Sequence, residues 1–291
     1  MKEIVFIKDY KSIDIYRKSF NELAIETFGI SFENWYQNGF WNQRYLPFSF
    51  IEGEKVIANV SVNLLDLIIH GETKSAVQIG TVMTHPEYRK RGLSTALMNK
   101  VIEEYENQCD FMYLFANPTV MNFYPRFGFH EIEEHLFSTE ISPGHSERVK
   151  LRKLNVNQEN DLAYIYQFAL ERMPASRRFG TSNAEGIFMY YCLNVFNDDI
   201  YLLEDDEVIV IFQEENYCMD IFDILFKSEI SMRDIVAKLI GADTIRINFH
   251  FTLDDQEIMT VSNIHRSRLF VRTNDNIQYP IHVKHPTTSI A

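Results

Sequence analysis

One short stretch of the chain, Met83 to Met98, has residue types and spacing suited to holding a phosphate group. It reads MTHPEYRKRGLSTALM, with three basic residues directly before Gly92 and then the start of a helical pattern. The first backbone N–H groups of a helix lack partners within the helix and carry partial positive charge, so they bind anions. Gly92 removes a Cβ from the path of a ligand. The stretch therefore predicts a phosphate-binding loop, with a solvated basic turn as the alternative interpretation.

The elements that must position this loop are a strand before it and a helix after it. After Gly92, apolar residues at Leu93, Leu97, Val101 and Tyr105 fall on one helical face. Before the loop, residues 63–84 continue an antiparallel pattern with a turn at 70–71. After the helix, FMYLFAN is a nearly continuous apolar run, as expected of a strand buried on both faces.

The flanking segments extend this pattern of helices and antiparallel strands. Helical spacing over residues 10–29 predicts a helix that Gly29 ends, followed by a short helix ending near Gly39. Two strands are expected around a turn at 52–54. Residues 118–129 predict a short helix that Pro125 helps to end, and 130–141 predict a closing strand.

These motifs, in this order, resemble the GNAT superfamily of N-acetyltransferases. The resemblance rests on VQIGTVMTHPEYRKRGLSTALMNKVIE and on YLFANPTVMNFYPRFGF, which carry the family's Arg-x-x-Gly-x-Gly/Ala loop, with Ser at its last position, and its Asn and Phe-Tyr-x-x-x-Gly-Phe motifs. It covers Val77 to Phe129 directly and about residues 3–140 by element order. It implies a mixed, mostly antiparallel sheet flanked by helices, acetyl-CoA as cosubstrate, and no metal.

The resemblance also assigns roles to residues. The backbone amide of Met83 or Val82 would polarise the thioester carbonyl. Tyr124 would protonate the departing CoA thiolate, and Asn117 would bind the pantetheine. The full expected set of cofactor-binding residues is Val82, Met83, Thr84, Arg89, Lys90, Arg91, Gly92, Leu93, Ser94, Thr95, Asn117 and Tyr124.

The base that takes a proton from the attacking amine is not assigned. Some family members have a Glu where this chain has Gln78, which cannot act as a base. Gln78 could instead hold a water chain, or a carboxylate such as Glu26 or Glu33 could act from the opening helices. The second half could also supply the base. Its acidic residues could bind a cationic amine, with a solvated acidic surface as the alternative: Asp198, Asp199, Asp205, Asp206 and Asp223.

The second half is expected to be a second, degenerate copy of the fold. Residues 142–149 cluster Ser, Pro and Gly and predict a linker between residues 1–141 and 150–291. Behind it the order of helix, helix, hairpin, strand, helix and strand recurs, without an Arg-x-x-Gly loop. The arrangement resembles acetyltransferases of the enhanced intracellular survival type, without their sterol-carrier-like domain. The second half would then shape the acceptor site.

Composition narrows the function further. The 291 residues carry a net charge of −13, which disfavours a general nucleic-acid binder. No apolar run approaches a membrane span, and the three cysteines have no metal-type spacing, so a reducing cytoplasm fits best. The prediction is an N-acetyltransferase acting on a primary amine, cationic or not, of a small molecule or peptide. A non-catalytic acetyl-CoA sensor or interaction module is the alternative, and a homo-oligomer stays open.

Overall fold

The structure, a computed structural model, describes residues 3–142, 148–254, 258, 260–273 and 277–291. Its strands are β1 (Ile4–Lys8), β2 (Tyr45–Glu52), β3 (Lys55–Ile69), β4 (Glu72–Thr84), β5 (Phe111–Phe115), β6 (His130–Glu140), β7 (Arg152–Lys153), β8 (Phe179–Ser182), β9 (Ile200–Leu203), β10 (Val208–Glu215), β11 (Cys218–Leu225), β12 (Arg246–Phe249) and β13 (Val261–Thr273).

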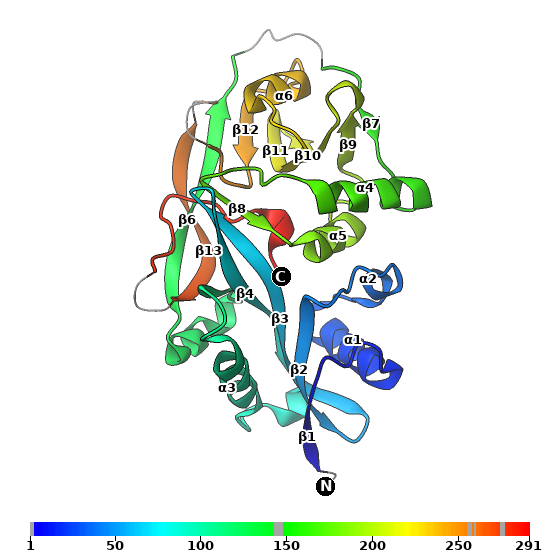
Figure 1. Cartoon of the computed structure of the whole chain (residues 1–291), viewed down its shortest axis with the longest axis vertical. Helices are drawn as coiled ribbons and strands as arrows, with labels where there is room; N and C mark the ends of the chain where they lie inside the picture. The colour runs from blue at the N-terminus through cyan, green and yellow to red at the C-terminus, as the bar shows by residue number, and fades with distance from the viewer. Residues whose placement is uncertain (1–2, 143–147, 255–257, 259, 274–276) are drawn as a thin grey trace.

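Helices cover both faces of these strands. The α-helices are α1 (Asp14–Phe28), α2 (Glu33–Gln37), α3 (Leu93–Tyr105), α4 (Glu159–Glu171), α5 (Glu185–Asn194) and α6 (Met232–Leu239). Short 3-10 turns are η1 (Pro86–Tyr88), η2 (Pro118–Phe127), η3 (Glu204–Asp206) and η4 (Thr287–Ser289). The two α-helices of the first 40 residues and α3 lie on opposite sides of β2, β3 and β4 (Figure 1).

One continuous sheet runs through the described residues. Its strand order is β1-β2-β3-β4-β5-β13-β6-β12-β11-β10-β9-β7, and β8 adds to β3. Most neighbours are antiparallel, whereas β4–β5 and β11–β12 are parallel. A mixed, mostly antiparallel sheet flanked by helices confirms the fold expected from the sequence.

Local sequence signals placed the elements of the first half well. Gly29 ends α1 with φ of 72°, in the left-handed region that glycine adopts freely. The apolar face of α3 buries Leu97, Met98 and Val101 completely against the sheet. Each such side chain contributes about 1.5–3 kcal/mol by leaving water, which explains why α3 docks in a single orientation.

Strands from the two halves alternate in the middle of the sheet, in the order β5-β13-β6-β12. β13, near the end of the chain, lies between β5 and β6, with Phe270 opposite both Leu114 and Glu131. β6 in turn pairs with β12, with Thr139 opposite Ile247. Each half is therefore completed by a strand of the other, and the linker expected at 142–149 falls partly outside the described residues. The division into 1–141 and 150–291 stays a prediction.

Two local expectations differ from the structure. Residues 118–127 form 3-10 turns around a non-helical Val120, and Pro125 lies inside them. The segment ends instead at Gly128, whose φ is 80°. The strands β8 and β13 were not anticipated, because their positions depend on partners far away in the sequence.

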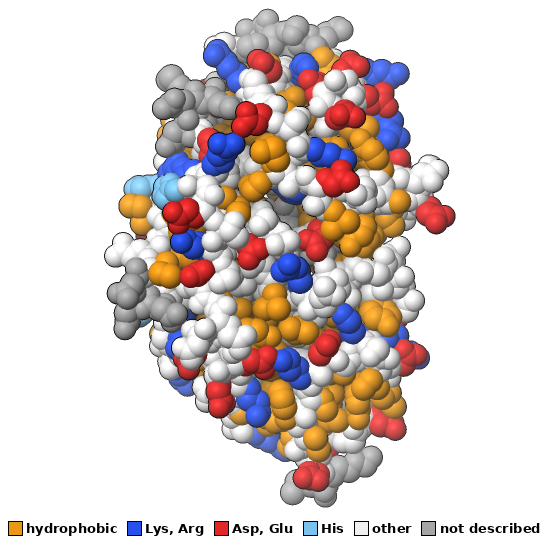
Figure 2. Space-filling model, in the orientation of Figure 1, with side chains coloured by type: hydrophobic (Ala, Val, Ile, Leu, Met, Phe, Trp, Pro, Cys, Tyr) orange, Lys and Arg blue, Asp and Glu red, His pale blue; other side chains and the backbone are white. Residues whose placement is uncertain are grey.

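The surface carries its charges in mixed order. On the face shown in Figure 2, acidic and basic side chains are interspersed without a large patch of one sign. In the part of the chain that the structure describes, no helix combines the length and apolar composition needed to cross a bilayer.

Candidate functional site

The strands β4 and β5 separate from one another beyond their paired segment. They are parallel over four residue pairs, the last of which joins Ile79 to Leu114. β4 then continues to Thr84, whereas β5 ends one residue after Leu114. The outer half of β4 thus presents an edge that no described strand covers, and such an edge can pair with an extended ligand that carries amide groups.

A bulge in β4 re-aims the backbone at this gap. The register with β3 shifts between Asn59 and Ser61, and Thr81 has φ of 48°, which is unusual for a β-branched residue. The side-chain amide of Asn59 donates a hydrogen bond to the Thr81 carbonyl at 2.8 Å. The hydroxyl groups of Tyr45 and Thr81 form a second hydrogen bond of 3.0 Å. These hydrogen bonds stabilise the strained backbone of Thr81, so the bulge is a defined part of the structure of the site.

The basic loop joins the end of β4 to the first turn of α3. Gly92 is the N-cap of α3 with φ of 78°, and Lys90 is also left-handed at 63°. The first helical hydrogen bond runs from the Ala96 amide to the Gly92 carbonyl at 2.9 Å, so the amides of residues 93–95 precede the helical ladder. The Ser94 hydroxyl lies 2.6 Å from that of Thr84. No side chain caps the helix, which leaves its positive end open to an anion.

The three basic side chains differ in how they are held. Arg89 donates to the Thr84 carbonyl at 3.2 Å, and the Arg91 guanidinium lies over the Tyr88 ring at 4.8 Å. Lys90 is exposed. The cationic groups surround the helix end without an acidic partner among these contacts, so they can meet a bound anion.

Tyr124 lies where a proton donor was expected. It is 4% exposed and packs against Phe123 and Phe270, with ring centres 5.3 and 5.9 Å away. Burial raises the pKa of its phenol to about 12. Among the described residues its hydroxyl has no hydrogen-bond partner, so it stays protonated at neutral pH and free to donate.

Asn117 starts the turn η2. Its side-chain oxygen accepts hydrogen bonds from the Thr119 amide at 3.0 Å and the Thr119 hydroxyl at 2.8 Å. The residue is exposed and also lines the cavity described next. Its amide nitrogen is thus left for another contact, while its oxygen serves the turn.

The edge of β4, Asn117 and Tyr124 line one cavity of about 510 Å3, whereas the residues of the basic loop and of the first turn of α3 lie outside its lining. Its walls come from the ends of β4 and β5, the α1–α2 segment, α5 and the C-terminal residues. Its lining residues are Phe28, Ile30, Phe32, Trp35, Tyr45, Asn63, Ile79, Gly80, Thr81, Val82, Phe115, Ala116, Asn117, Val120, Tyr124, Ile187, Tyr190, Tyr191, Val195, Ile290 and Ala291. Val82 and Tyr124 therefore share the cavity, while Met83 beside it is buried in the aromatic core.

Gln78 is engaged by the C-terminal residues rather than by open space. It is fully buried, and its amide nitrogen donates to the Tyr113 hydroxyl at 3.0 Å and to the Ser289 carbonyl at 2.8 Å. Its amide oxygen accepts from the backbone N–H of Ala291 at 2.5 Å. A Cβ on Gly80 would lie 3.0 Å from the Ala291 carbonyl carbon, so the glycine makes room for this segment.

The two carboxylates considered in the opening helices lie outside the cavity lining. Glu26 is 3.8 Å from the His85 ring. Glu33 accepts from Arg17 at 3.2 Å and from Gln37 at 2.6 Å. Partial burial opposes ionisation of Glu33, but hydrogen bonds from Gln37 and Arg17 outweigh it and hold its pKa below the ordinary value.

The corresponding gap in the second half is filled by the chain itself. Beyond the β11–β12 pairing, the Thr287 amide donates to the His250 carbonyl at 3.1 Å, and the Thr288 hydroxyl donates to Asp223 at 2.5 Å. Asp223 also forms a bidentate pair with Arg172, at 2.6 and 2.8 Å. None of the second half's acidic candidates lines the central cavity.

The helix that follows β11 also differs from α3. Ser231 caps α6 by accepting a hydrogen bond from the Asp234 amide at 3.2 Å. Asp234 places a carboxylate in the first turn, where it would repel an anion. This helix end is already satisfied by its own side chains.

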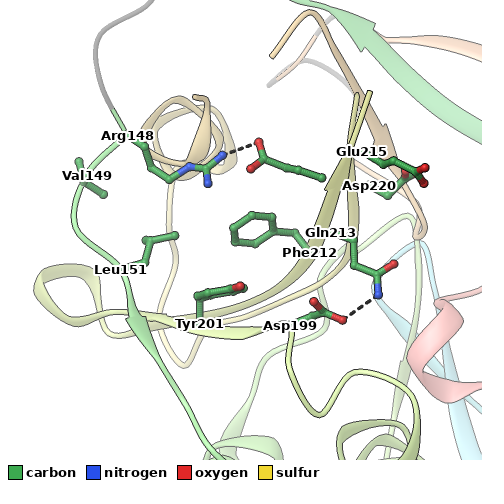
Figure 3. Close-up of a pocket in the computed structure, with 10 residues that line it drawn as sticks. Arg148, Val149, Leu151, Asp199, Tyr201, Phe212, Gln213, Glu215 and Asp220 are labelled. Atoms are coloured by element: carbon green, nitrogen blue, oxygen red, sulfur yellow. Dashed lines mark hydrogen bonds and ion pairs between the residues drawn. The ribbon is translucent and has the colours of Figure 1, made fainter. Parts of the chain in front are cut away.

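A larger hollow of about 700 Å3 lies in the second half (Figure 3). Arg148 forms an ion pair with Glu214 across it, and Gln213 donates to Asp199 at 2.7 Å. Phe212 lies between these two pairs (Figure 3). Four polar side chains of this hollow are thus paired with one another. The hollow has neither an open helix end nor a strand gap among its lining residues, so the central cavity is the better candidate for chemistry.

Comparison with known proteins agrees with the fold. Residues 12–132 match the family model described as an acetyltransferase (GNAT) domain. A protein of unknown function from Enterococcus faecalis V583, described as a probable N-acyltransferase, is 18% identical with a TM-score of 0.63, covering 94% of this chain and 72% of that one. A GCN5-related N-acetyltransferase from Kribbella flavida is 19% identical, with a TM-score of 0.59 and coverage of 93% and 72%.

A third similar structure is Eis1 from Mycobacterium abscessus. It is 12% identical with a TM-score of 0.58, covering 94% of this chain and 74% of that one. At these identities the likeness shows a common fold over both halves. No curated protein matches the sequence. Residues 12–132 thus match a GNAT acetyltransferase domain, and the likeness in fold continues through the second half.

Proposed function

We propose that the GNAT acetyltransferase domain formed around residues 12–132 moves an acetyl group directly from acetyl-CoA to a primary amine. The observation that carries the proposal is the order of three features along β4. The uncovered edge of β4 and the buried phenol of Tyr124 border the same cavity, and the uncapped end of α3 follows the end of β4 through the basic loop. These are the groups that a pyrophosphate, a pantetheine arm and a leaving thiolate require.

The cofactor would lie along this path. The amides of residues 93–95, with Arg89 and Arg91 near them, would receive the pyrophosphate. The pantetheine would add to the edge of β4 in the manner of a strand, with Asn117 offering its free amide nitrogen. The bulge at Thr81 would aim the amide of Val82 or Met83 at the thioester oxygen.

The reaction itself needs little from charged groups. The amine attacks the thioester carbonyl carbon, and the developing oxyanion accepts a hydrogen bond from the β4 amide. When the C–S bond breaks, the thiolate takes the proton of Tyr124, and the phenolate then recovers a proton from solvent. The amine's own proton leaves to solvent. A desolvating site favours the uncharged amine, which eases that loss without a dedicated carboxylate.

The second half would serve the acceptor. Its own strand gap is filled, and α5 contributes part of the cavity wall. The peptide or small-molecule amine would therefore approach between α5 and the α1–α2 segment. In this proposal the second half is a degenerate domain that shapes the acceptor side.

Two measurements test the proposal together. Titration calorimetry should detect acetyl-CoA binding, and thiol release should accompany addition of an amine from a panel of monoamines, polyamines, aminoglycosides and peptides. Acetyl-CoA binding without thiol release for any amine would favour the alternative of a non-catalytic acetyl-CoA sensor, for which the amide at Gln78 is the motivating feature. Absence of acetyl-CoA binding would remove both functions.

A further inference from the structure

The part of the cavity remote from the β4–β5 gap is built from aromatic rings. Phe32 stacks on Tyr45 with ring centres 5.7 Å apart, and Tyr190 of α5 approaches Phe32 at 5.3 Å. Trp35 stands perpendicular to Tyr45 at 5.2 Å. Its indole N–H already donates to the Gly186 carbonyl at 2.7 Å, so what Trp35 offers the cavity is ring surface.

No residue that lines this cavity, among those the structure describes, has a charged side chain. The nearby carboxylate of Glu185 accepts from Asn42 at 3.2 Å and is not part of the lining. The lining side chains offer no counter-ion to an ammonium group, and a polycation would bring several charges that none of these side chains can balance. The cavity therefore selects against polyamines and aminoglycosides.

The edge of the cavity is apolar as well. Phe28, Val120 and Val195 line it and are 41%, 43% and 46% exposed. These side chains come from α1, η2 and the end of α5, so three separate segments place apolar surface at the same opening. Such surface is stabilised when an apolar ligand covers it.

One polar group in the cavity lacks a partner. Asn63 of β3 is 3% exposed, and its side-chain amide nitrogen is buried without a hydrogen-bond partner among the described residues. A buried donor left unpaired costs free energy that a ligand atom can restore. Asn63 thus offers a hydrogen bond to an oxygen atom on an otherwise apolar ligand.

We infer that the acceptor is a primary monoamine on an aromatic body, an arylalkylamine, whose ring lies against Phe32, Tyr45 and Tyr190. A phenolic or carbonyl oxygen on that body receives the Asn63 hydrogen bond. This inference rests on the proposed function and names its substrate class. The C–N bond forms by attack on the thioester carbonyl, the C–S bond then breaks, the thiolate takes the proton of Tyr124, and the amine's proton goes to solvent, from which the Tyr124 phenolate recovers one.

The direct test compares amines at fixed acetyl-CoA by thiol release. 2-Phenylethylamine, tyramine and tryptamine should each exceed spermidine and kanamycin in kcat/KM by about tenfold or more. Tyramine should exceed 2-phenylethylamine, and Asn63→Leu should abolish that difference. A polycation as the best acceptor would overturn the inference while leaving acetyl transfer itself established.

Two matched pairs of variants locate the effect. Tyr190→Ala should lower kcat/KM for 2-phenylethylamine about tenfold and leave acetyl-CoA affinity within about twofold; Tyr164→Ala, on the exposed face of α4, should change neither. Val195→Glu adds a carboxylate at the opening and should shift preference toward spermidine. Ile245→Glu, 47% exposed and outside the cavity lining, is its control.

Failure of the inference and failure of the proposed function give different results. Binding of 2-phenylethylamine can be followed by quenching of tryptophan fluorescence, because Trp35 lines the cavity. Saturable quenching without thiol release would support the arylalkylamine site and remove the acetyltransferase function. Neither quenching nor turnover with any aromatic amine would overturn the inference.

Discussion

The side chain of Gln78 and the backbone of Ala291 are joined by a 2.5 Å hydrogen bond across 213 residues of sequence. The same amide group binds Tyr113 and the Ser289 carbonyl, so every hydrogen bond of Gln78 fixes either the strand next to it or the C-terminal segment. Some GNAT enzymes have a Glu at the position of Gln78. In this protein Gln78 instead holds the C-terminal segment, which forms part of the cavity wall.

The chain of hydrogen bonds from His285 through Tyr113 to Gln78 determines which way the side-chain amide of Gln78 is oriented. The Nδ1–H of His285 donates to the Pro286 carbonyl at 3.1 Å, which leaves Nε2 to accept from the Tyr113 hydroxyl at 2.9 Å. The Tyr113 oxygen then accepts from Gln78. Each step needs the neutral imidazole and the amide nitrogen as donor.

The first prediction concerns Gln78→Glu, which would restore an acid at this position. We expect lower activity, because an ionised carboxylate cannot donate to Tyr113 or Ser289. Stability should fall by about 1–3 kcal/mol for the unsatisfied buried groups. Steady-state kinetics and urea unfolding measure the two effects. The losses should be smaller at pH 5.5 than at pH 8, since a protonated Glu recovers one donor. Increased activity would contradict the role of Gln78 in holding the C-terminal segment.

The second prediction concerns the open end of α3. Thr95→Glu adds a negative charge to the first turn, which favours the helix but repels a pyrophosphate. Acetyl-CoA affinity should fall about tenfold without loss of thermal stability. Asn99→Glu, an exposed site one turn further along the same helix, is the matched control. Titration calorimetry compares the acetyl-CoA affinities of the two variants. Equal affinities would show that the pyrophosphate does not bind at the N-terminus of α3.

The third prediction concerns Tyr124→Phe. Removing the phenol proton donor should lower kcat by about 10²–10⁴-fold and leave acetyl-CoA binding within about threefold. The ring contacts with Phe123 and Phe270 are kept, so folding should be unaffected. Loss of binding equal to the loss of turnover would exclude the acid role.

The fourth prediction concerns acid sensitivity. Burial lowers the pKa of His285 to about 4, whereas the unfolded chain has the ordinary value near 6.5. Between pH 6.5 and pH 4, His285 is protonated in the unfolded chain but neutral in the folded protein. The stability that comes from keeping His285 neutral is therefore fully present above pH 6.5 and is lost as the pH falls toward 4. The loss amounts to about 3 kcal/mol.

Urea unfolding at pH 7.5 and pH 5.0 should show the part of this loss that is complete by pH 5.0, about 2 kcal/mol. His285→Gln keeps a donor and an acceptor and should make stability less dependent on pH. The neighbouring Glu134 and Lys284, paired at 2.9 Å, are unchanged in that variant. An unchanged pH dependence would assign the acid sensitivity to other groups, such as His135 or His265, whose pKa values burial also lowers.

The sequence predicted what depends on neighbours along the chain. Gly92 and Ser94 marked the loop between β4 and α3, and Gly29 marked the end of α1, because each acts through local backbone geometry. The place of β13 between β5 and β6 could not be read in this way. Strand pairing at that distance is chosen by packing and leaves no periodic signal.

The acceptor side was missed for the same reason. Tyr190 and Tyr191 lie in GIFMYYCLNVF, which is apolar on every side and predicts only a buried helix. No feature of this segment's own sequence indicates that Tyr190 packs against Phe32 and Trp35 of the first half. The acidic residues proposed for the acceptor were visible in the sequence, but their partners, such as Arg172 for Asp223, appear only in the fold.

The exchange of β6 and β13 has a consequence for the nascent chain. When the first half leaves the ribosome, the edge of β5 that will receive β13 has no partner until nearly the whole protein has been made. An unpaired strand edge invites pairing with other chains, so synthesis passes through a stage prone to aggregation. Once β13 is in place, neither half can unfold without opening the other's sheet, and the protein should melt as a single cooperative unit.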